Sequence, residues 1–333
     1  MSSIPYTPTC SVVICTRNRP EALVRCLQAL AQLAYPRYEV LVVDNAPCDD
    51  VALETARRWR ARYLIEPIPG LSRARNSGAR ACSSEVIAFI DDDAIPEPTW
   101  LSRLTRQFRD PSVAAVTGRT VPLLEGTAVA IPSYETADVG PQPIRLHRSL
   151  PLWFEMACFG GIGNGNNMAF RRQVFEWWTG FDEKLGRGAL VSSGEEHRAF
   201  AHLVESGCTV VYTPDAIVRH RVPQTLEEHR DQYIRSRSDL AAYAVYLLLD
   251  TRHRWRITKY LAEAALGTRR TWRFRTEVVP PNLVSRRSLL RAYVTGACTC
   301  LWGLLRSDPR PNASGDRTRR QRTETGRVRL AQE

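Results

Sequence analysis

Three consecutive carboxylates, Asp91, Asp92 and Asp93, follow the apolar run Val-Ile-Ala-Phe-Ile of residues 86–90. Like charges this close repel one another unless a cation or hydrogen-bond donors offset them. Carboxylate oxygens favour Mg²⁺ or Mn²⁺, and these ions keep water ligands and bridge substrate phosphates. Acidic triplets also occur in solvated loops, but here a buried strand would fix where the carboxylates emerge. The triplet therefore predicts a divalent-cation site.

Polar side chains also follow two other apolar runs, at residues 11–15 and 39–43. In open α/β sheets, ligands bind beyond the carboxyl ends of the strands. We therefore expect cationic groups and carboxylates from three strand ends to meet at one crevice. The residues that follow the two runs are Thr16, Arg17 and Arg19 after the first and Asp44 after the second.

A helix is predicted to begin near Gly70 and to carry two arginines in its first turns. The guanidinium group fits phosphate oxygens, and a helix N-terminus adds backbone donors. Arginines that simply face water are the alternative, and for Arg73 the two interpretations weigh equally. Arg75 and Asn76 are better placed for a phosphate-bearing ligand.

The elements that must position these residues follow from the hydrophobic pattern. Short β-branched runs alternate with helical patterns from residue 10 to about 120, which is typical of βαβ units and a largely parallel sheet. A helix is predicted from Pro20, since leucines recur behind it at helical spacing. The predicted fold class is α/β, with a mostly parallel central sheet flanked by helices. Its clearest strands are Ser11 to Cys15, Glu39 to Val43, Val86 to Ile90 and Val113 to Thr117.

Four short motifs, taken as an ordered set, resemble the family 2 glycosyltransferases, a large inverting group with the GT-A fold. The likeness covers roughly residues 10–222. It implies a Rossmann-like nucleotide-binding half and metal-dependent transfer of a sugar from a nucleotide-diphosphate donor to a hydroxyl-bearing acceptor. The motifs are Thr16-Arg17-Asn18-Arg19, Val42-Val43-Asp44-Asn45, Ala74-Arg75-Asn76 and Phe89-Ile90-Asp91-Asp92-Asp93.

The resemblance also implies a role for each motif. Breaking the anomeric bond places negative charge on the departing diphosphate, and a divalent cation (Mg²⁺ or Mn²⁺) would stabilise that charge. The resemblance assigns the nucleoside base to Asp44 and to the Thr16 loop, which includes Arg17 and Arg19. It assigns the ribose or diphosphate to Arg75 and Asn76. Asp91 and Asp92 would face the nucleoside, and Asp93 would bind the metal.

An inverting transfer needs a base that removes the proton of the acceptor hydroxyl. The family places an acidic pair at a helix start, and Glu195 and Glu196 match it, although the family usually has aspartate at the second position. Glu196 shares a helix face with Phe200 and Leu203, so we expect it to point toward the core with a raised pKa. Glu195 could instead interact with the helix dipole. Glu196 is the favoured base, with Glu195 as the alternative.

Three further residues are weaker candidates. His220 follows the last strand of the core, and related enzymes use a histidine there as a metal ligand, although a structural histidine is the more frequent case. Asp182 and Glu183 follow Trp177 and Trp178. Aromatic rings suit sugar faces and carboxylates suit hydroxyls, so both acidic residues are candidates for acceptor binding. Paired tryptophans in a core are the alternative.

After Pro223 the sequence changes to long, arginine-rich helical patterns. We predict a catalytic domain at 1–222, a helical C-terminal region at 223–306 and a disordered tail at 307–333, where apolar residues are few. The apolar stretches there are shorter than the roughly 20 residues of a membrane span. Because arginines flank them, a helix lying on an anionic bilayer is an alternative to ordinary core packing.

The net charge of +11 suits nucleic acid, an anionic membrane or a phosphate-rich substrate. Nucleic acid is not expected, since the basic tail lacks aromatic residues that stack on bases. Nine scattered cysteines without a CxxC pair favour a reducing compartment. With no secretion signal at the start, a cytoplasmic location is predicted, peripheral at the inner face of the cell membrane if the helices bind lipid.

Two other classes of protein share parts of this pattern. A dehydrogenase or a sugar nucleotidyltransferase would carry a glycine-rich loop after the first strand, and no glycine stands between Cys15 and Pro20. A non-catalytic protein that docks to a membrane or a partner would be expected to lose the acidic triplet or the glutamate pair, and both are present. The acceptor, whether sugar, lipid or small molecule, stays open.

Overall fold

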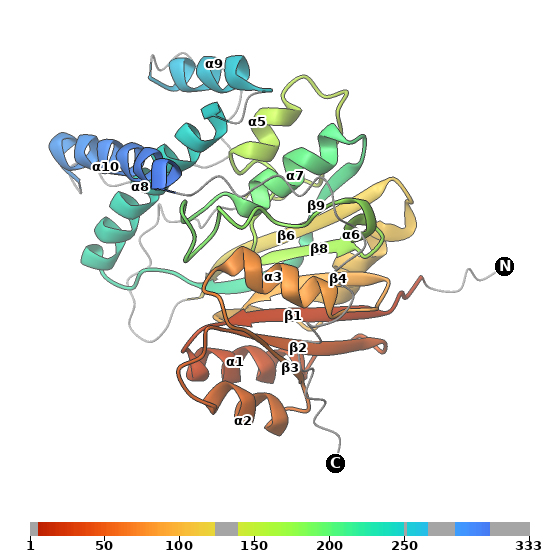
Figure 1. The fold of residues 1–333 in the computed structure, drawn as a ribbon. Helices are drawn as coiled ribbons and strands as arrows, with labels where there is room; N and C mark the ends of the chain where they lie inside the picture. Colours follow the sequence, from red (N-terminus) through yellow and green to blue (C-terminus); the bar gives the residue numbers. More distant parts are fainter. Residues whose placement is uncertain (1–5, 124–138, 250–251, 266–283, 307–333) are drawn as a thin grey trace, which may run out of the picture.

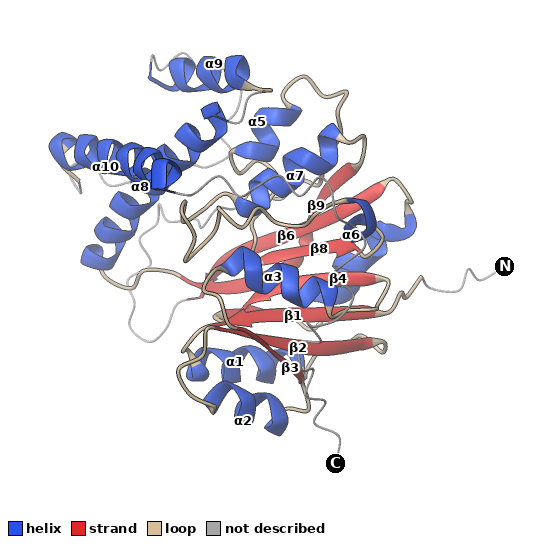
Figure 2. Cartoon of the chain, viewed as in Figure 1, coloured by secondary structure: helices blue, strands red, loops and turns tan. Residues whose placement is uncertain are grey.

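The computed structural model describes residues 6–123, 139–249, 252–265 and 284–306. Within these ranges a single sheet is flanked by helices (Figure 1, Figure 2). The strands are β1 (Cys10–Thr16), β2 (Tyr38–Asn45), β3 (Arg62–Glu66), β4 (Val86–Asp91), β5 (Ala94–Pro96), β6 (Val113–Leu123), β7 (Ile144–Leu146), β8 (Asn167–Arg171) and β9 (Thr209–Arg221). The helices are α1 (Pro20–Leu30), α2 (Val51–Arg58), α3 (Leu71–Arg80), α4 (Trp100–Thr105), the 3-10 helix η1 (Arg106–Arg109), α5 (Trp153–Cys158), α6 (Val174–Trp177), α7 (Glu195–Glu205), α8 (Leu226–Leu249), α9 (Arg254–Ala265) and α10 (Arg286–Arg306).

The N-terminal half of the sheet is parallel. Its strands lie in the order β3-β2-β1-β4, and each neighbouring pair runs in the same direction. The register places Thr16 of β1 opposite Asp44 of β2, and Cys15 opposite Asp91 of β4. The three strand ends that the sequence indicated therefore meet at one edge of the sheet, as predicted.

The other half of the sheet is mixed. β8 lies between β4 and β6 and is antiparallel to both, while β6 and β9 are parallel. β5 and β7 pair with β9 in the antiparallel direction. The α/β fold class is confirmed. The sheet is mixed, with parallel pairing among β1 to β4 and between β6 and β9, and antiparallel pairing for β5, β7 and β8. Residues 113–117 form part of β6, as predicted, yet β8 separates them from β4.

The strands are nearly continuously apolar because both faces of the sheet are covered. Along β1, Val13 belongs to a core with α3, α5 and α7, whereas Val12 and Ile14 belong to a second core with α1 and α4. α1 begins at Pro20, as predicted, where the missing N–H of proline leaves no helical bond unmade. Its leucines are buried in the second core. Both cores hold the strand ends rigidly.

The helices after β9 pack onto the first of these cores. Tyr243 of α8, Ile257 of α9 and Cys300 of α10 belong to it, and Figure 1 shows α8 and α10 crossing beside α5 and α7. Among the described helices, α10 has the length and composition of a membrane span, with 17% of its apolar window buried. The predicted tail at 307–333 lies outside the described residues.

Candidate active site

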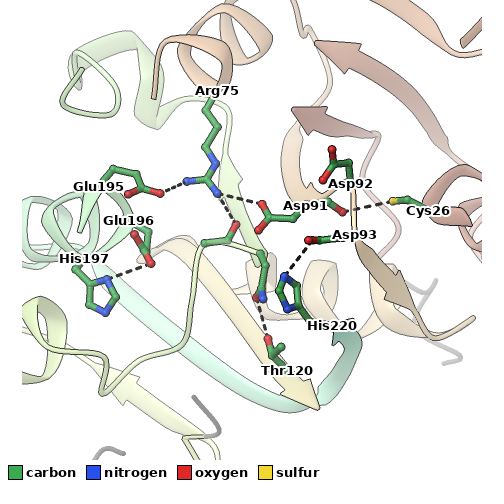
Figure 3. Close-up of polar contacts among 12 residues, drawn as sticks. Cys26, Arg75, Asp91, Asp92, Asp93, Thr120, Glu195, Glu196, His197 and His220 are labelled. Atoms are coloured by element: carbon green, nitrogen blue, oxygen red, sulfur yellow. Dashed lines mark hydrogen bonds and ion pairs between the residues drawn. The ribbon is translucent and has the colours of Figure 1, made fainter. Parts of the chain in front are cut away.

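Asp91, Asp93 and His220 come together from distant parts of the sequence. Asp91 ends β4, and the short strand β5 just after the triplet pairs with β9 so that Ala94 lies opposite His220. Each of the three side chains offers one ligand atom, and these atoms lie within 4.8 Å of one another (Figure 3). The two residues predicted to hold the metal, Asp93 and His220, are thus neighbours. Asp91, which the sequence assigned to the nucleoside side, joins them.

Cationic side chains of the protein offset the charge of Asp93. Arg19 Nη1 donates to Asp93 Oδ2 at 2.8 Å, and His220 Nε2 lies 3.0 Å from Asp93 Oδ1. Burial alone would raise the pKa of Asp93, but His220 and Arg19 outweigh burial and hold that pKa well below its usual range. Burial would likewise lower the pKa of His220, and the charge of Asp93 outweighs it, so this pKa is raised. The site is therefore built to stabilise an ionised Asp93.

The Asp93 carboxylate retains an atom that can bind a cation. Its Oδ1 is buried and faces the His220 imidazole at 3.0 Å, a group that would itself bind the cation in its neutral form. Two carboxylates and an imidazole form a donor set of the kind that binds Mn²⁺ or Mg²⁺ with water and phosphate completing the shell. The side chains present therefore fit a divalent cation.

Asp92 is fully buried beside this group. Its carboxylate accepts hydrogen bonds from Thr16 Oγ1 at 2.8 Å and from Arg19 Nε at 3.1 Å. Burial raises the pKa of Asp92 to about 6, although Arg19 and Thr16 act in the opposite direction. This carboxylate connects the Thr16 loop to the end of β4, and its predicted place beside the nucleoside stays a prediction.

Arg75 connects the acidic group, which is the cluster of Asp91, Asp93 and His220, to α7, the helix that carries the two glutamates. Its Nη1 donates to Glu195 Oε1 at 2.6 Å, and its Nη2 donates to Asp91 Oδ1 at 3.3 Å and to the Gly165 carbonyl at 3.1 Å (Figure 3). The side chain is only 3% exposed. Its guanidinium is enclosed by protein acceptors, and a contact of Arg75 with the ribose or diphosphate stays a prediction.

Asn76, the next residue of α3, also bonds to the protein itself. Its side-chain nitrogen donates to the Phe181 carbonyl at 2.9 Å, and its oxygen accepts from the Phe181 N–H at 2.8 Å. This pair of bonds fastens the segment after α6 to α3. The buried amide thus satisfies backbone groups of Phe181 that would otherwise lack a partner. The contact of Asn76 with the ribose or diphosphate stays a prediction.

Glu195 and Glu196 begin α7, as predicted, but Glu195 is the more buried of the two. The Glu195 side chain is 7% exposed and that of Glu196 is 14% exposed. Burial and the neighbouring Glu196 raise the pKa of Glu195 to about 7, against the opposite effect of Arg75. Burial would also raise the pKa of Glu196, but His197 Nδ1, 3.2 Å from Glu196 Oε1, outweighs it and holds this pKa below its usual range. The expected rise in pKa thus falls on Glu195 and not on Glu196.

The raised pKa of Glu195 predicts a pH-dependent stability. The folded chain keeps this proton up to about pH 7, while the unfolded chain releases it near the ordinary value of 4.5. The stabilisation that this proton gives is fully present below the unfolded pKa and is lost as the pH rises through the folded pKa, by about 3 kcal/mol. In EDTA, the melting temperature of the wild type relative to Glu195→Gln should fall between about pH 5 and about pH 8. A difference that stays constant would contradict this assignment.

Asp44 at the end of β2 is buried and accepts a hydrogen bond from Tyr63 Oη at 2.8 Å. Burial raises the pKa of Asp44. Tyr63 lies on β3, which was not predicted, so the sequence analysis missed this partner. The apolar run Tyr63-Leu64-Ile65 was the available signal. Arg17 is exposed at the same strand edge. Nucleoside binding by Asp44 and Arg17 stays a prediction.

A pocket of about 350 Å³ lies between α7 and the segment 178–183. Asp182 and Glu183 line it, as their predicted role near the acceptor requires, but both already have protein partners. Asp182 accepts a hydrogen bond from Tyr246 of α8, and Glu183 pairs with Arg73 at 2.7 Å. Acceptor binding by the two carboxylates stays a prediction. Trp178 beside them is part of the core.

Known proteins resemble this chain in sequence. The sequence model of "Glycosyl transferase family 2" matches residues 11–176. Pre-mycofactocin glycosyltransferase of Mycobacterium tuberculosis is 29% identical over 231 residues, which are 67% of this chain and 43% of that protein. Succinoglycan biosynthesis protein ExoM of Rhizobium meliloti is 30% identical over 227 residues, which are 63% of this chain and 66% of ExoM. This chain therefore spans less than half the length of the first of these relatives.

The fold also resembles a solved structure, that of the mannosyltransferase PcManGT from Pyrobaculum calidifontis in complex with GDP-Man and Mn²⁺. The TM-score is 0.56 at 18% sequence identity, and the match covers 90% of this chain and 88% of that chain. The sheet order, the acidic group at the strand ends and these matches define a glycosyltransferase with the GT-A fold. The chain belongs to glycosyltransferase family 2.

Proposed function

We propose that this protein transfers a hexosyl group from a nucleotide-diphosphate sugar to a hydroxyl-bearing acceptor, with inversion at the anomeric carbon and with a divalent cation. One observation carries the proposal: Arg75 contacts both Asp91 of the acidic group and Glu195 of the acidic helix. A cation site and a proton acceptor are thereby held in one region, as a displacement at a sugar carbon requires. The complex of PcManGT with GDP-Man and Mn²⁺ supports the same donor class.

The cation would be held by Asp93 and His220, with Asp91 beside them. When bound, Mn²⁺ or Mg²⁺ supplies positive charge that stabilises the departing diphosphate. Asp44 and the Thr16 loop with Arg17 would contact the nucleoside. Asp92 would act indirectly, since its bonds to Thr16 and Arg19 hold that loop in place. Both Mg²⁺ and Mn²⁺ fit these ligands, and the proposal covers either ion.

Glu196 is proposed as the base that takes the proton of the acceptor hydroxyl. Its carboxylate is ionised beside His197, and its side chain is the more exposed of the two glutamates and so the more accessible to an acceptor hydroxyl. Glu195 is the alternative, since its pKa, raised to about 7, suits a base, but its Oε1 is already bonded to Arg75. The pocket lined by Asp182 and Glu183 is the proposed acceptor side. Sugar, lipid and small-molecule acceptors all fit this chemistry.

Asp93→Asn tests the cation site. The amide keeps the shape of the side chain but removes a charged ligand, so Mn²⁺-dependent stabilisation by a nucleotide sugar should weaken about 10- to 100-fold in apparent affinity. Thermal shift with UDP-, GDP- and dTDP-sugars, in Mn²⁺ and in EDTA, measures this. Asp215→Asn is the matched control, since Asp215 is an exposed carboxylate paired with Arg106 on another part of the surface. Donor binding that is equally strong with Asp93→Asn would contradict the proposal.

The same panel separates the rival functions. A sugar nucleotidyltransferase would be stabilised by a nucleoside triphosphate and a sugar phosphate, and would release pyrophosphate. A non-catalytic docking protein would show no hydrolysis of any nucleotide sugar in Mn²⁺. The glycosyltransferase proposal expects slow hydrolysis of one donor, with release of the nucleoside diphosphate.

The division into a catalytic domain, a helical region and a tail is also a proposal, and so is the cytoplasmic location. The proposed catalytic residues all fall within 1–222. From the 223–306 region, α8 contributes Tyr243 to the core and Tyr246 as the partner of Asp182. The tail at 307–333 is proposed to be disordered from its composition alone. All nine cysteines are free thiols, which supports a reducing, cytoplasmic compartment.

A further inference from the structure

One face of α10 is apolar and exposed among the described residues. Large aliphatic side chains recur there at helical spacing, so they form a single stripe along the helix. This set is called the α10 stripe below. It comprises Leu290, Val294, Leu301 and Leu305, which are 65%, 54%, 45% and 82% exposed. A helix with so much exposed aliphatic surface is uncommon in a soluble monomer and marks an interaction site.

The fold does not use the α10 stripe, because α10 packs through a different face. Ala292, Gly296 and Cys300 are buried, one turn apart, and lie against α8. At Gly296 the Ser238 carbonyl of α8 leaves no room for a side chain. At Gly303 the Leu190 side chain occupies the corresponding space. These close contacts fix the rotation of α10 and leave the stripe outward.

The charge of α10 favours an anionic partner. The helix carries Arg286, Arg287, Arg291 and Arg306 and no acidic residue. At its C-terminal end the Arg306 guanidinium lies over the exposed ring of Trp302, 4.4 Å from the ring centroid. Arginine and tryptophan together are typical of the boundary between lipid head groups and acyl chains. A straight apolar stripe bordered by cations matches a flat anionic bilayer.

A transmembrane orientation disagrees with the packing of α10. Gly296 lies at the middle of α10 and contacts Ser238 of α8. Arg235, Arg237 and Asp239 surround that position on α8. If α10 spanned a membrane in its present packing, these three ionisable side chains would lie near the bilayer midplane, where each is costly. An orientation in the plane of the bilayer avoids this.

We propose that α10 docks this protein on an anionic phospholipid bilayer, lying in the plane of the surface with the α10 stripe among the acyl chains and its arginines at the head groups. The contact of Gly303 with Leu190 places the docking helix against the segment that leads into Glu195. The bilayer would thus lie one helix layer from the proposed acceptor side.

Vesicle flotation of the full-length protein tests the proposal. The probes are vesicles of phosphatidylcholine alone and of phosphatidylcholine with about 30% phosphatidylglycerol, the fraction that supplies anionic head groups. The wild type should float with the anionic vesicles at low salt, and less at high salt or with phosphatidylcholine alone. The combined variant L290Q/V294Q/L301Q/L305Q should partition about 100-fold or more weakly, because four apolar side chains no longer enter the acyl region.

A matched control replaces exposed apolar side chains elsewhere. Val24 of α1 and Val51 of α2 are exposed at the other end of the molecule (Figure 1), so V24Q/V51Q should float like the wild type. Circular dichroism and Mn²⁺-dependent thermal shift with a nucleotide sugar should be unchanged in both variants, because no substitution touches the donor site. Loss of flotation with unchanged donor binding would thus bear on the docking proposal alone. Loss of donor binding with unchanged flotation would bear on the proposed function alone.

Three outcomes would overturn the proposal. Wild type that stays at the bottom of the gradient with anionic vesicles would exclude lipid docking. A wild-type dimer that the stripe variant converts to monomer in analytical ultracentrifugation, without flotation, would assign the stripe to a second copy of the chain. Protein that resists extraction by alkaline carbonate would span the membrane instead of lying on it.

Discussion

Glu196→Gln should slow sugar transfer by about 10²- to 10⁴-fold, the usual contribution of a general base. The amide cannot take the proton of the acceptor hydroxyl, while its size and its neighbours His197 and Glu195 are retained. Donor binding does not involve this carboxylate in the proposed arrangement, so the thermal shift by nucleotide sugar and Mn²⁺ should be unchanged. Hydrolysis of the nucleotide sugar measures the rate without knowledge of the acceptor, because water then replaces the acceptor hydroxyl.

Two variants at the same helix start serve as controls. Glu196→Asp keeps a carboxylate and restores the residue usual in the family, so it should retain far more activity than Glu196→Gln. Glu195→Gln should alter the stability and its pH dependence more than the rate, since Glu195 is bonded to Arg75. Normal turnover by Glu196→Gln together with inactive, folded Glu195→Gln would reverse the assignment of the base.

Arg75→Gln should destabilise the fold by about 3–5 kcal/mol, the range found when one partner of a buried ion pair is removed. The guanidinium donates to Glu195, Asp91 and the Gly165 carbonyl, and at about pH 8, above the Glu195 pKa of about 7, its loss would leave an ionised Glu195 buried without a counter-ion. Urea unfolding monitored by tryptophan fluorescence measures the change. Activity should fall as well, because the acidic group and α7 would lose their shared contact.

The neighbouring Arg73 offers a matched control on the same helix. It pairs with Glu183 near the surface, so Arg73→Gln should change the unfolding free energy by less than about 1 kcal/mol. In the double variant Arg75→Gln/Glu195→Gln no carboxylate is left buried without its cation, so the loss should be smaller than the sum of the two single losses. Additive losses would show that the Arg75–Glu195 pair is not the source of the effect.

The sequence indicated most of the elements that form from local pattern. Runs that are apolar on both faces became β1, β2, β4 and β6, and α1 and α7 begin at the predicted residues. Strands β3 and β5 were not predicted, since each is short and acquires its structure by pairing with a longer neighbour. The insertion of β8 between β4 and β6 was equally invisible, because pairing order is a property of the whole sheet.

The candidate site divides in a similar way. Asp93, His220 and the glutamate pair were recognised from residue type and motif, and the structure brings Asp93 and His220 together. Arg75 and Asn76 were assigned to the donor because arginine and amide groups suit phosphates. Their burial, and their bonds to Glu195 and Phe181, could not be read from residue type. Sequence motifs report which groups are present, whereas only packing shows which groups remain accessible.

The amino-acid sequence by itself determined the family, the α/β class and the acidic residues at the strand ends, because these follow from hydrophobic period and from short motifs. Only the tertiary structure decided which glutamate carries the raised pKa, that Asp91 stands with Asp93 and His220, and which side of α10 is left apolar and exposed. The physical reason is the same in each case. Burial, partner charge and accessible surface depend on neighbours that are distant in the chain, and a residue acquires them when the chain folds.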